Sequence, residues 1–317
     1  MKPVALKRSV GFKAGFVAIL GRPNAGKSTL LNALVGTKLA IVASKPQTTR
    51  TSIQGVLTLA SEPGKDGGAT TGNAQIVFVD TPGIHKSSSL LSRHMMDAAR
   101  GAVETDLLIY VVDALAPASE EDARAVDLVK KSGAPAIAVL NKVDRLERKP
   151  KLLELIERYR AMHDFAAYIP ISARTGKGLD VLLREIIARL PKGKPIFPDD
   201  YLTDQPERFR AAELVREKIL RLTEQEVPHS VAVMIETWED TPKLLRIGAV
   251  IYVERAGQKA ILIGPGGALL KRIGTEARQD LERLLDRKVF LQTFVKVHPR
   301  WREQPEFLAA VDWRAGS

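Results

Sequence analysis

Residues 21–28 read Gly-Arg-Pro-Asn-Ala-Gly-Lys-Ser, which matches the phosphate-binding loop pattern G-x-x-x-x-G-K-[ST]. A short apolar run at residues 15–20 precedes the loop, and apolar residues at helical spacing follow at 30–35. This strand–loop–helix order predicts that backbone N–H groups and a helix N-terminus surround the phosphate oxygens of a nucleoside triphosphate. The loop residues expected to bind it are Gly21, Asn24, Ala25, Gly26, Lys27, Ser28 and Thr29.

Two loop side chains and a later motif predict a site that uses Mg²⁺. Lys27 is expected to reach the β- and γ-phosphates, and the Ser28 hydroxyl is expected to bind Mg²⁺. The sequence Asp-Thr-Pro-Gly, from Asp80 to Gly83, ends a second apolar run. Its aspartate would hold Mg²⁺ through water, and the Gly83 N–H would meet the γ-phosphate. Asp-x-x-Gly alone is common in turns, so its position after a phosphate loop carries the prediction.

A third motif, Asn-Lys-Val-Asp, predicts which base is bound. A carboxylate at Asp144 can accept two hydrogen bonds from guanine N1–H and N2–H₂, whereas adenine offers no matching pair. Asn141 is expected to tie this segment to the phosphate loop, and the stem of Lys142 to cover the ring. The alternative is an ordinary helix cap at Asp144.

Ser172 and Ala173 follow a further apolar run, and the Ala173 N–H is expected to meet guanine O6. The ordered motifs, from residue 16 to about residue 190, resemble the GTPases of the Ras-like superfamily. The resemblance implies an α/β domain with a mostly parallel sheet and helices on both faces.

The same resemblance implies that a threonine of segment 45–50 closes over Mg²⁺ and the γ-phosphate. Thr48 and Thr49 are both candidates, and Thr49 is favoured. Ile84 stands where Ras-like enzymes carry a water-orienting glutamine, so intrinsic turnover is expected to be slow or to use another group. Bacterial GTPases with asparagine at the position of Asn24 often bind K⁺. The predicted catalytic residues are therefore Lys27, Thr49 and Asn24.

Length and charge limit the remaining possibilities. A chain of 317 residues suits two domains, and the absence of cysteine excludes disulfides and thiolate metal sites. No apolar run approaches the roughly 20 residues that span a bilayer, and the N-terminus lacks a signal-peptide core, so we expect a cytoplasmic protein. Net charge is +11, with thirteen Lys/Arg against five Asp/Glu in residues 243–302, which favours an anionic partner.

Composition divides the chain into five parts. We expect a basic extension at 1–14, a GTPase domain at 15–190, a Pro/Gly-rich linker at 191–208, a second domain at 209–302 and a tail at 303–317. Residues 61–75 are rich in turn formers and are assigned no function.

The second domain has its own pattern: a helix at 209–222, strands at 228–236 and 248–255, a helix from Ala268, another through 274–285, and a strand at 289–297. With the glycine-rich turn 264–267, this α-β-β-α-α-β order resembles a type II KH domain, α+β in class, whose G-x-x-G turn receives a nucleic-acid backbone. Ile261 and Ile273 could line the core or a groove. The expected RNA-binding residues are Gly264, Pro265, Gly266, Gly267, Lys271, Arg272 and Arg278.

The combined motifs resemble the Era family of bacterial GTPases over nearly the whole chain. That resemblance implies a monomer using GTP/GDP, Mg²⁺ and K⁺, which binds the 3′ end of 16S rRNA on the 30S subunit and partly contacts the inner membrane. Two alternatives stay open: a tandem-domain ribosome-assembly GTPase with a KH-like end, and an RNA-binding protein with a vestigial nucleotide site.

Overall fold

The structure is a computed structural model that describes residues 11–43, 45, 48–59, 73–83, 90–91, 95, 105–147, 150–225 and 227–316. Most of the turn-rich segment 61–75, the first ten residues and Ile84 lie outside the described residues. The chain forms two compact units. Unit 1 comprises Met1–Ala40, Ser52–Lys86 and Met96–Asp204, and unit 2 comprises Ile41–Thr51, Ser87–Met95 and Gln205–Ser317. Each unit is described by itself.

Unit 1 is built on a six-stranded sheet with strand order β2-β3-β1-β4-β5-β6. Only β2 runs antiparallel to its neighbour; β1, β3, β4, β5 and β6 pair in parallel. The parallel strands are almost fully buried, as expected for a sheet covered on both faces. The strands are β1 Lys13–Leu20, β2 Ile53–Leu59, β3 Ala74–Asp80, β4 Leu107–Asp113, β5 Ala136–Asn141 and β6 Ala167–Pro170.

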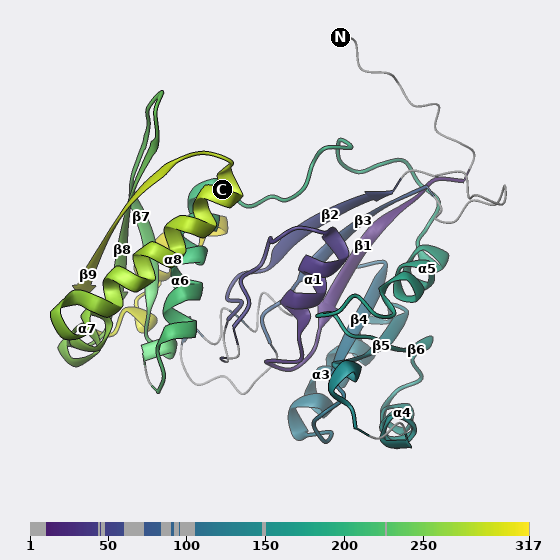
Figure 1. Cartoon of the computed structure of the whole chain (residues 1–317). Coiled ribbons are helices and arrows are strands. Elements are labelled where there is room, and N and C mark those ends of the chain that lie inside the picture. The colour runs from purple at the N-terminus through teal and green to yellow at the C-terminus, as the bar shows by residue number, and fades with distance from the viewer. Residues whose placement is uncertain are drawn as a thin grey trace, which may run out of the picture. The chain divides into compact units, whose positions relative to one another are not determined.

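Helices cover both faces of this sheet (Figure 1). One apolar core lies under α1 (Lys27–Val35) and α5 (Leu179–Arg189). The other lies under α3 (Glu120–Ser132) and α4 (Pro150–Met162). The expected α/β class with helices on both faces is therefore confirmed. In such sheets, ligands bind beyond the carboxyl ends of the strands, which is where β1, β3, β5 and β6 lead into the predicted motifs.

The segment after α5 is tied to unit 1 by one buried glutamine. The Gln75 side chain accepts hydrogen bonds from the N–H groups of Ile196 (2.7 Å) and Phe197 (2.8 Å), and it donates to the Phe197 carbonyl (2.9 Å). Further along, the Val56 N–H donates to the Leu202 carbonyl at 2.8 Å. Much of the Pro/Gly-rich segment thus packs along the sheet of unit 1.

Unit 2 has a three-stranded sheet in the order β7-β8-β9, with β7 antiparallel and β9 parallel to β8. Its apolar core lies between one face of this sheet and the helices α6, α7 and α8. The elements are α6 Glu207–Leu222, β7 Ala232–Asp240, β8 Leu245–Val253, α7 Ala256–Ile263, α8 Ala268–Leu285 and β9 Val289–Val297. The α-β-β-α-α-β order is the predicted one, and together with the turn it has the type II KH arrangement.

One prediction for unit 2 was wrong. The helix from Ala268 and the helix through 274–285 are a single helix, α8, and the helix before the turn is α7. The helix runs through Gly274 without a break, and this residue packs against Thr293 of β9 with room for ordinary van der Waals contact. After β9 comes α9 (Pro305–Val311). Its Leu308 packs with buried Trp301 and with Ala232, the first residue of β7. Across the described residues, no helix has the length and apolarity to cross a membrane.

Candidate functional site

The phosphate loop of unit 1 is shaped by a close approach at Gly26. This residue has φ +97°, and a Cβ added to it would lie 2.3 Å from the Asn141 side-chain nitrogen. Any other residue would push the two loops apart. Gly83 is crowded in the same way, since a Cβ added to it would lie 2.8 Å from the backbone of Pro23. The predicted Asp80–Gly83 segment therefore lies directly against the phosphate loop.

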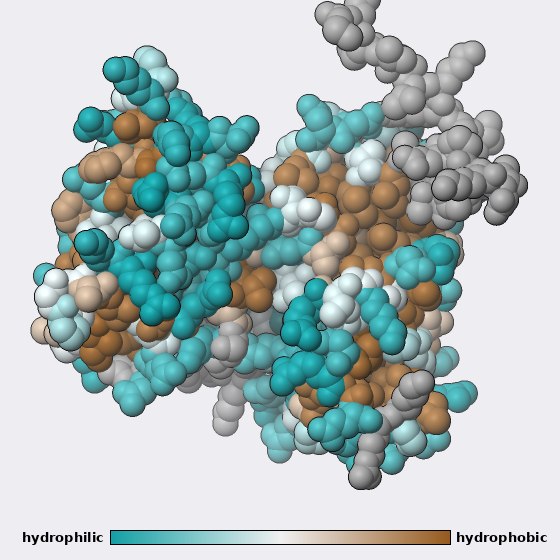
Figure 2. All heavy atoms as spheres, viewed as in Figure 1, coloured by the Kyte–Doolittle hydropathy of each residue, from teal (hydrophilic) through white to brown (hydrophobic). Residues whose placement is uncertain are grey.

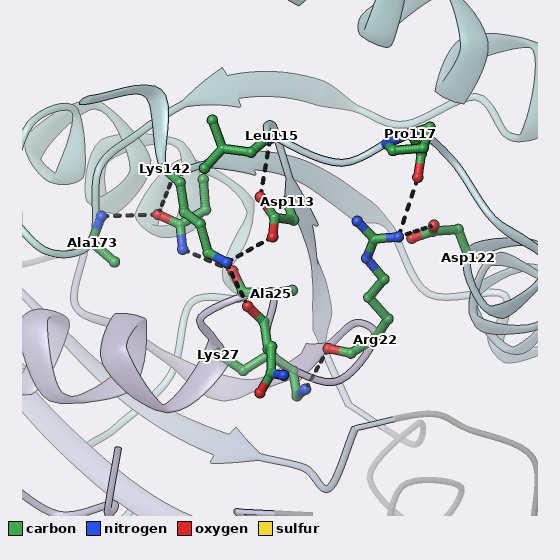
Figure 3. A network of polar contacts seen from close by, with 11 residues as sticks. Arg22, Ala25, Lys27, Asp113, Leu115, Pro117, Asp122, Lys142 and Ala173 are labelled. Carbon is green, nitrogen blue, oxygen red and sulfur yellow. Dashed lines mark hydrogen bonds and ion pairs between the residues drawn. The ribbon is translucent and has the colours of Figure 1, made fainter. Parts of the chain in front are cut away.

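Asn141 joins three loops through one side-chain amide, and its partners Ala25, Lys142 and Ala173 are labelled in Figure 3. Its Nδ2 donates to the Ala25 carbonyl at 2.9 Å, which is the expected tie to the phosphate loop. Its Oδ1 accepts hydrogen bonds from the N–H groups of Lys142 (2.8 Å) and Ala173 (3.0 Å). The Ala173 N–H predicted to face guanine O6 is thus directed at Asn141 in this structure. Asn141 is 2 % exposed, so water does not compete for these contacts.

The Lys27 ammonium is held inside its own loop. Its Nζ donates to the carbonyls of Gly21 and Arg22, both at 3.1 Å. Burial lowers the pKa of Lys27 from 10.5 to about 8, and the nearby Asp80 carboxylate partly opposes that shift. The Lys27 ammonium is therefore still mostly charged at neutral pH but loses its proton at a lower pH than an ordinary lysine.

Ser28 and Asp80 are brought together at the carboxyl ends of β1 and β3. The Ser28 hydroxyl donates to an Asp80 carboxylate oxygen at 2.8 Å, and Asp80 is fully buried. A hydroxyl and a carboxylate oxygen are the hard donors that Mg²⁺ prefers, so these residues fit the ion. Next to them the Thr81 hydroxyl donates to the Ile19 carbonyl at 2.8 Å, which fixes the strand end.

Asp144 has its own partners at the base-reading end. One carboxylate oxygen accepts a hydrogen bond from Arg174 at 2.6 Å. The hydrogen bond from Ser172, followed by that from Arg174, lowers the pKa of Asp144, so the carboxylate is ionised at neutral pH. The Lys142 ammonium donates to the Asn24 carbonyl and to the Asp113 carboxylate, each at 2.7 Å, which holds its stem across this end of the loop.

Thr48 and Thr49 lie in unit 2, whereas Ser28 and Asp80 lie in unit 1. The Thr48 hydroxyl donates to the Lys45 carbonyl at 2.6 Å, and Thr49 is buried. The structure thus groups both threonines with the second unit.

The glycine-rich turn of unit 2 joins α7 to α8. Positive φ angles at Gly264, Gly266 and Gly267 let the chain turn tightly, and an added Cβ at either of the last two would meet no atom within 4 Å. Ile261 of α7 is 46 % exposed next to this turn, while Ile273 of α8 is fully buried in the core.

The three predicted basic residues all lie on α8, which presents a hydrophilic surface in Figure 2. Lys271 is exposed. Arg272 pairs with Glu276 (2.9 Å), and Arg278 pairs with Glu282 (3.0 Å). Two of the three cations are therefore partly neutralised within the helix.

Comparison with known proteins identifies both units. A family model described as 50S ribosome-binding GTPase matches residues 16–142, and a KH domain model matches residues 226–302. GTPase Era of Syntrophus aciditrophicus is 46 % identical over 303 residues, which is 95 % of each chain. GTPase Era of Ruminiclostridium cellulolyticum is 41 % identical over 96 % of this chain and 99 % of its own. The chain belongs to the Era family of GTPases.

Two solved structures extend this result. A crystal structure of Era with MgGDPNP and nucleotides 1506–1542 of 16S ribosomal RNA is 40 % identical, with TM-score 0.89 over 95 % of this chain and 98 % of that one. A point variant of Aquifex aeolicus Era bound to GDP·AlF₄⁻ gives TM-score 0.86 at 40 % identity, over 94 % and 98 %. This Era-family protein is therefore a GTPase, and neither the tandem-domain type nor a vestigial nucleotide site is favoured.

Sequence reasoning missed a buried ion pair behind the phosphate loop (Figure 3). The Arg22 guanidinium donates to Asp122 at 3.3 Å and to the Pro117 carbonyl at 3.2 Å. Asp122, 0 % exposed, also accepts hydrogen bonds from the hydroxyls of Tyr110 (2.7 Å) and Ser119 (2.9 Å). Its only signal was the Ser-x-x-Asp capping box at the start of α3, since Arg22 occupies a variable position of the loop motif.

We predict that Arg22→Met destabilises the chain by about 3 kcal/mol, because it leaves the Asp122 carboxylate buried without a counter-charge. Urea unfolding measures this loss, and adding Asp122→Asn to the same chain should recover most of it. Arg184→Met is the matched control, since Arg184 and Asp180 form an exposed pair and its loss should cost under about 0.5 kcal/mol. Equal effects of Arg22→Met and Arg184→Met would contradict the prediction.

Proposed function

We propose that this GTPase binds the 3′ end of 16S rRNA through its KH domain during 30S assembly, and that nucleotide state controls that binding. The observation that carries the coupling is the placement of Ile41–Thr51, which bears both candidate switch threonines, within unit 2. The RNA partner is supported by the 40 % identical Era whose crystal structure contains that RNA. We propose domain limits of 15–190 for the GTPase and 209–302 for the KH domain, with 191–208 as the link.

In this proposal, Lys27 and the backbone of residues 21–29 hold the phosphates, and Ser28 with Asp80 holds Mg²⁺. When bound, Mg²⁺ supplies positive charge to the β- and γ-phosphate oxygens. The Gly83 N–H faces the γ-phosphate. The support is geometric, because the Asp80–Gly83 segment touches the phosphate loop and the two Mg²⁺ residues already share a hydrogen bond.

The proposed base readers are Asp144, Asn141, Lys142, Ser172 and Ala173. Asp144 accepts the guanine N–H groups after Arg174 moves away, and the Ser172 contact keeps the carboxylate charged. The exchange replaces one charged partner of Asp144 with two guanine donors. The carboxylate is therefore never left without a hydrogen bond.

Three contacts hold the switch segment in unit 2, and we refer to residues 41–51 in this arrangement as the seated segment. Ile41 is buried in the same apolar core as Val215 of α6. The Val42 N–H donates to the Glu217 carboxylate at 2.9 Å, and the Arg216 guanidinium donates to the Thr48 carbonyl. Closing either threonine over Mg²⁺ would work against these contacts, so GTP binding and seating compete.

A buried arginine makes this seat less stable than its contacts suggest. Arg50 donates to the Val231 carbonyl at 2.8 Å and lies 5.5 Å from the Trp301 ring. Burial, together with the positive charges of Arg216 and Arg302, lowers its pKa to about 9, although Glu213 partly compensates. Among the described residues, two of its guanidinium nitrogens, Nε and Nη2, are buried and find no hydrogen-bond partner. These costs favour release of the seated segment when a nucleotide offers Thr48 or Thr49 another site.

A test of the coupling truncates the apolar anchor of the seat. Ile41→Ala should raise affinity for a non-hydrolysable GTP analogue about tenfold and leave GDP affinity unchanged, because only the triphosphate draws the threonines away. Isothermal titration measures both, and Ile196→Ala, which truncates an exposed isoleucine, is the control. Unchanged or reduced analogue affinity would exclude competition between the seat and the nucleotide. RNA affinity that is identical in apo, GDP and analogue forms would exclude the coupling itself.

The lowered pKa of Lys27 predicts that nucleotide binding depends on pH. Its pKa of about 8 in the free protein lies below 10.5, so the lysine loses its proton as pH rises through 8, while phosphate contact requires the charged form. GTP affinity should therefore fall above pH 8 by up to about tenfold per pH unit. Titration at pH 8 in two buffers of different ionisation enthalpy should show uptake of about 0.5 proton, which Lys27→Ala abolishes. GTP binding by the wild type at pH 8 without proton uptake would contradict this role of Lys27.

We propose that Asn24 supports K⁺-assisted hydrolysis, with Lys27 and Thr49 as the other catalytic residues. Asn24 lies in the left-handed region (φ 61°), so glycine removes its side chain without adding backbone strain. Turnover should be faster in K⁺ than in Na⁺, and Asn24→Gly should erase that difference. Equal rates of the wild type in both salts would end the hypothesis.

For the RNA side, we propose that residues 264–267 receive the RNA backbone and that Lys271, Arg272 and Arg278 contact phosphates. The open space around Gly266 and Gly267 supports this role. Three further proposals rest on the family resemblance alone: a monomer, a cytoplasmic location, and partial peripheral contact with the inner membrane.

A further inference from the structure

The two faces of the unit 2 sheet differ in what covers them. Alternate residues of β8 and β9, among them Ile251 and Val295, point into the core under the helices. The other set faces away, and four of its members pair in register: Arg246 with Phe290, and Val250 with Phe294. At the far end of this outer face, the Tyr252 ring packs against Phe307 of α9 at 5.1 Å between centroids.

Beyond that contact Val250 is buried, but the edge of the outer face exposes two aromatic rings. Phe290 is 46 % exposed and Phe294 is 51 % exposed, and these are the two aromatic rings among the large apolar side chains that the described residues leave exposed. The Arg246 guanidinium lies 5.8 Å from the centre of the Phe290 ring. Gln292, exposed between the two rings, offers an amide that can hydrogen-bond to a base. We call Arg246, Phe290, Gln292 and Phe294 the outer platform.

Charged residues of both signs lie on this face, and Glu239 of β7 is in register with Arg246. Lys296, next on the same face of β9, is paired with the Glu236 carboxylate at 3.1 Å, and the Tyr252 hydroxyl donates to the same carboxylate. Lys296 is thus largely neutralised, which leaves Arg246 as the cation of the platform. A cation beside two exposed rings matches single-stranded nucleic acid, because its bases stack on aromatic rings and its phosphates carry negative charge.

We propose that the outer platform is a second binding surface for single-stranded RNA, on which bases stack over Phe290 and Phe294. The proposal rests on the RNA-binding function given above. The two rings stand four residues apart on one strand, about 13 Å, with the Gln292 amide between them. Two stacking positions therefore flank one position for hydrogen bonding to a base edge.

The position of β9 connects this platform to the glycine-rich turn. β9 is the edge strand of the sheet, and α7, which leads into the turn, packs over its inner side. Since an edge strand has no neighbour on its outer side, a strand of RNA leaving the turn can pass around β9. A KH turn holds about four nucleotides, so a longer single strand has nucleotides to spare for the outer platform.

The test compares two lengths of RNA on the full-length protein. The probes are the last four and the last twelve nucleotides of 16S rRNA, measured by competition in fluorescence anisotropy. The double variant Phe290→Ala/Phe294→Ala should bind the twelve-mer about 100-fold more weakly, roughly tenfold per ring, and the four-mer within twofold of wild type. Leu153→Ala, a truncation at a side chain 65 % exposed in unit 1, should change neither affinity.

A second pair of variants separates this proposal from the proposed function. Gly266→Asp places a carboxylate at the turn and should weaken both RNAs, whereas Gly266→Asn has similar size and tolerance for φ +56° without the charge and should weaken neither. If both Gly266 variants bind like wild type, the turn is not the RNA site.

Two results would overturn the outer platform. One is a twelve-mer affinity that the double phenylalanine variant leaves unchanged while Gly266→Asp lowers it. The other is a dimer in sedimentation that the same double variant converts to monomer with RNA affinity intact, which would assign the face to a second copy of this chain. Because both rings are exposed, the melting temperature should stay within a few degrees of wild type, and a larger drop would show that they serve as core.

Discussion

One side-chain amide fixes the geometry of the nucleotide site. Asn141 holds the phosphate loop through the Ala25 carbonyl and holds the base-reading loops through the N–H groups of Lys142 and Ala173. The approach is possible only because Gly26 has no Cβ. The distance between the phosphate-binding and base-reading ends is therefore set by a buried hydrogen-bond network rather than by the loops themselves. This rigidity allows a nucleotide to be recognised at both ends without first ordering the site.

Four charged groups around this site already have partners. The Lys27 ammonium rests on loop carbonyls, Asp80 accepts from Ser28, and Asp144 accepts from Arg174. Arg22 lies behind the loop and balances the buried Asp122. A nucleotide arriving here exchanges partners instead of meeting bare charges. Its affinity is the difference between two sets of contacts, and protons move with it wherever a pKa differs between them.

Local motifs were readable from the sequence, whereas contacts between distant segments were not. The loop 21–28, the Asp80 and Asp144 motifs and the order of elements in unit 2 follow from short-range spacing, and the structure has them in place. The central strand β4 was missed although residues 107–112 are an unbroken apolar run. The pair Arg22–Asp122 spans 100 residues, and no pattern along the chain joins its members. Nor does any pattern show where the short apolar run at residues 39–43 divides, since Leu39 and Ala40 are buried in the core of unit 1 and Ile41 is buried in the core of unit 2.

The burial of Ile41 in the core of unit 2 determines how strong the proposed coupling can be. The seat is favoured by burial of one isoleucine and by hydrogen bonds at Val42 and Thr48, and it is opposed by the partly unsatisfied, buried guanidinium of Arg50. Coupling between two sites is typically about 1–3 kcal/mol, and the proposed coupling needs a net preference for the seat of that size. If the seat were much more stable, no triphosphate could draw the threonines away. If it were much less stable, nucleotide binding would not change the RNA affinity of the second unit. Since coupling is reciprocal, an RNA that loosens the seat must also tighten the grip on GTP by the same factor.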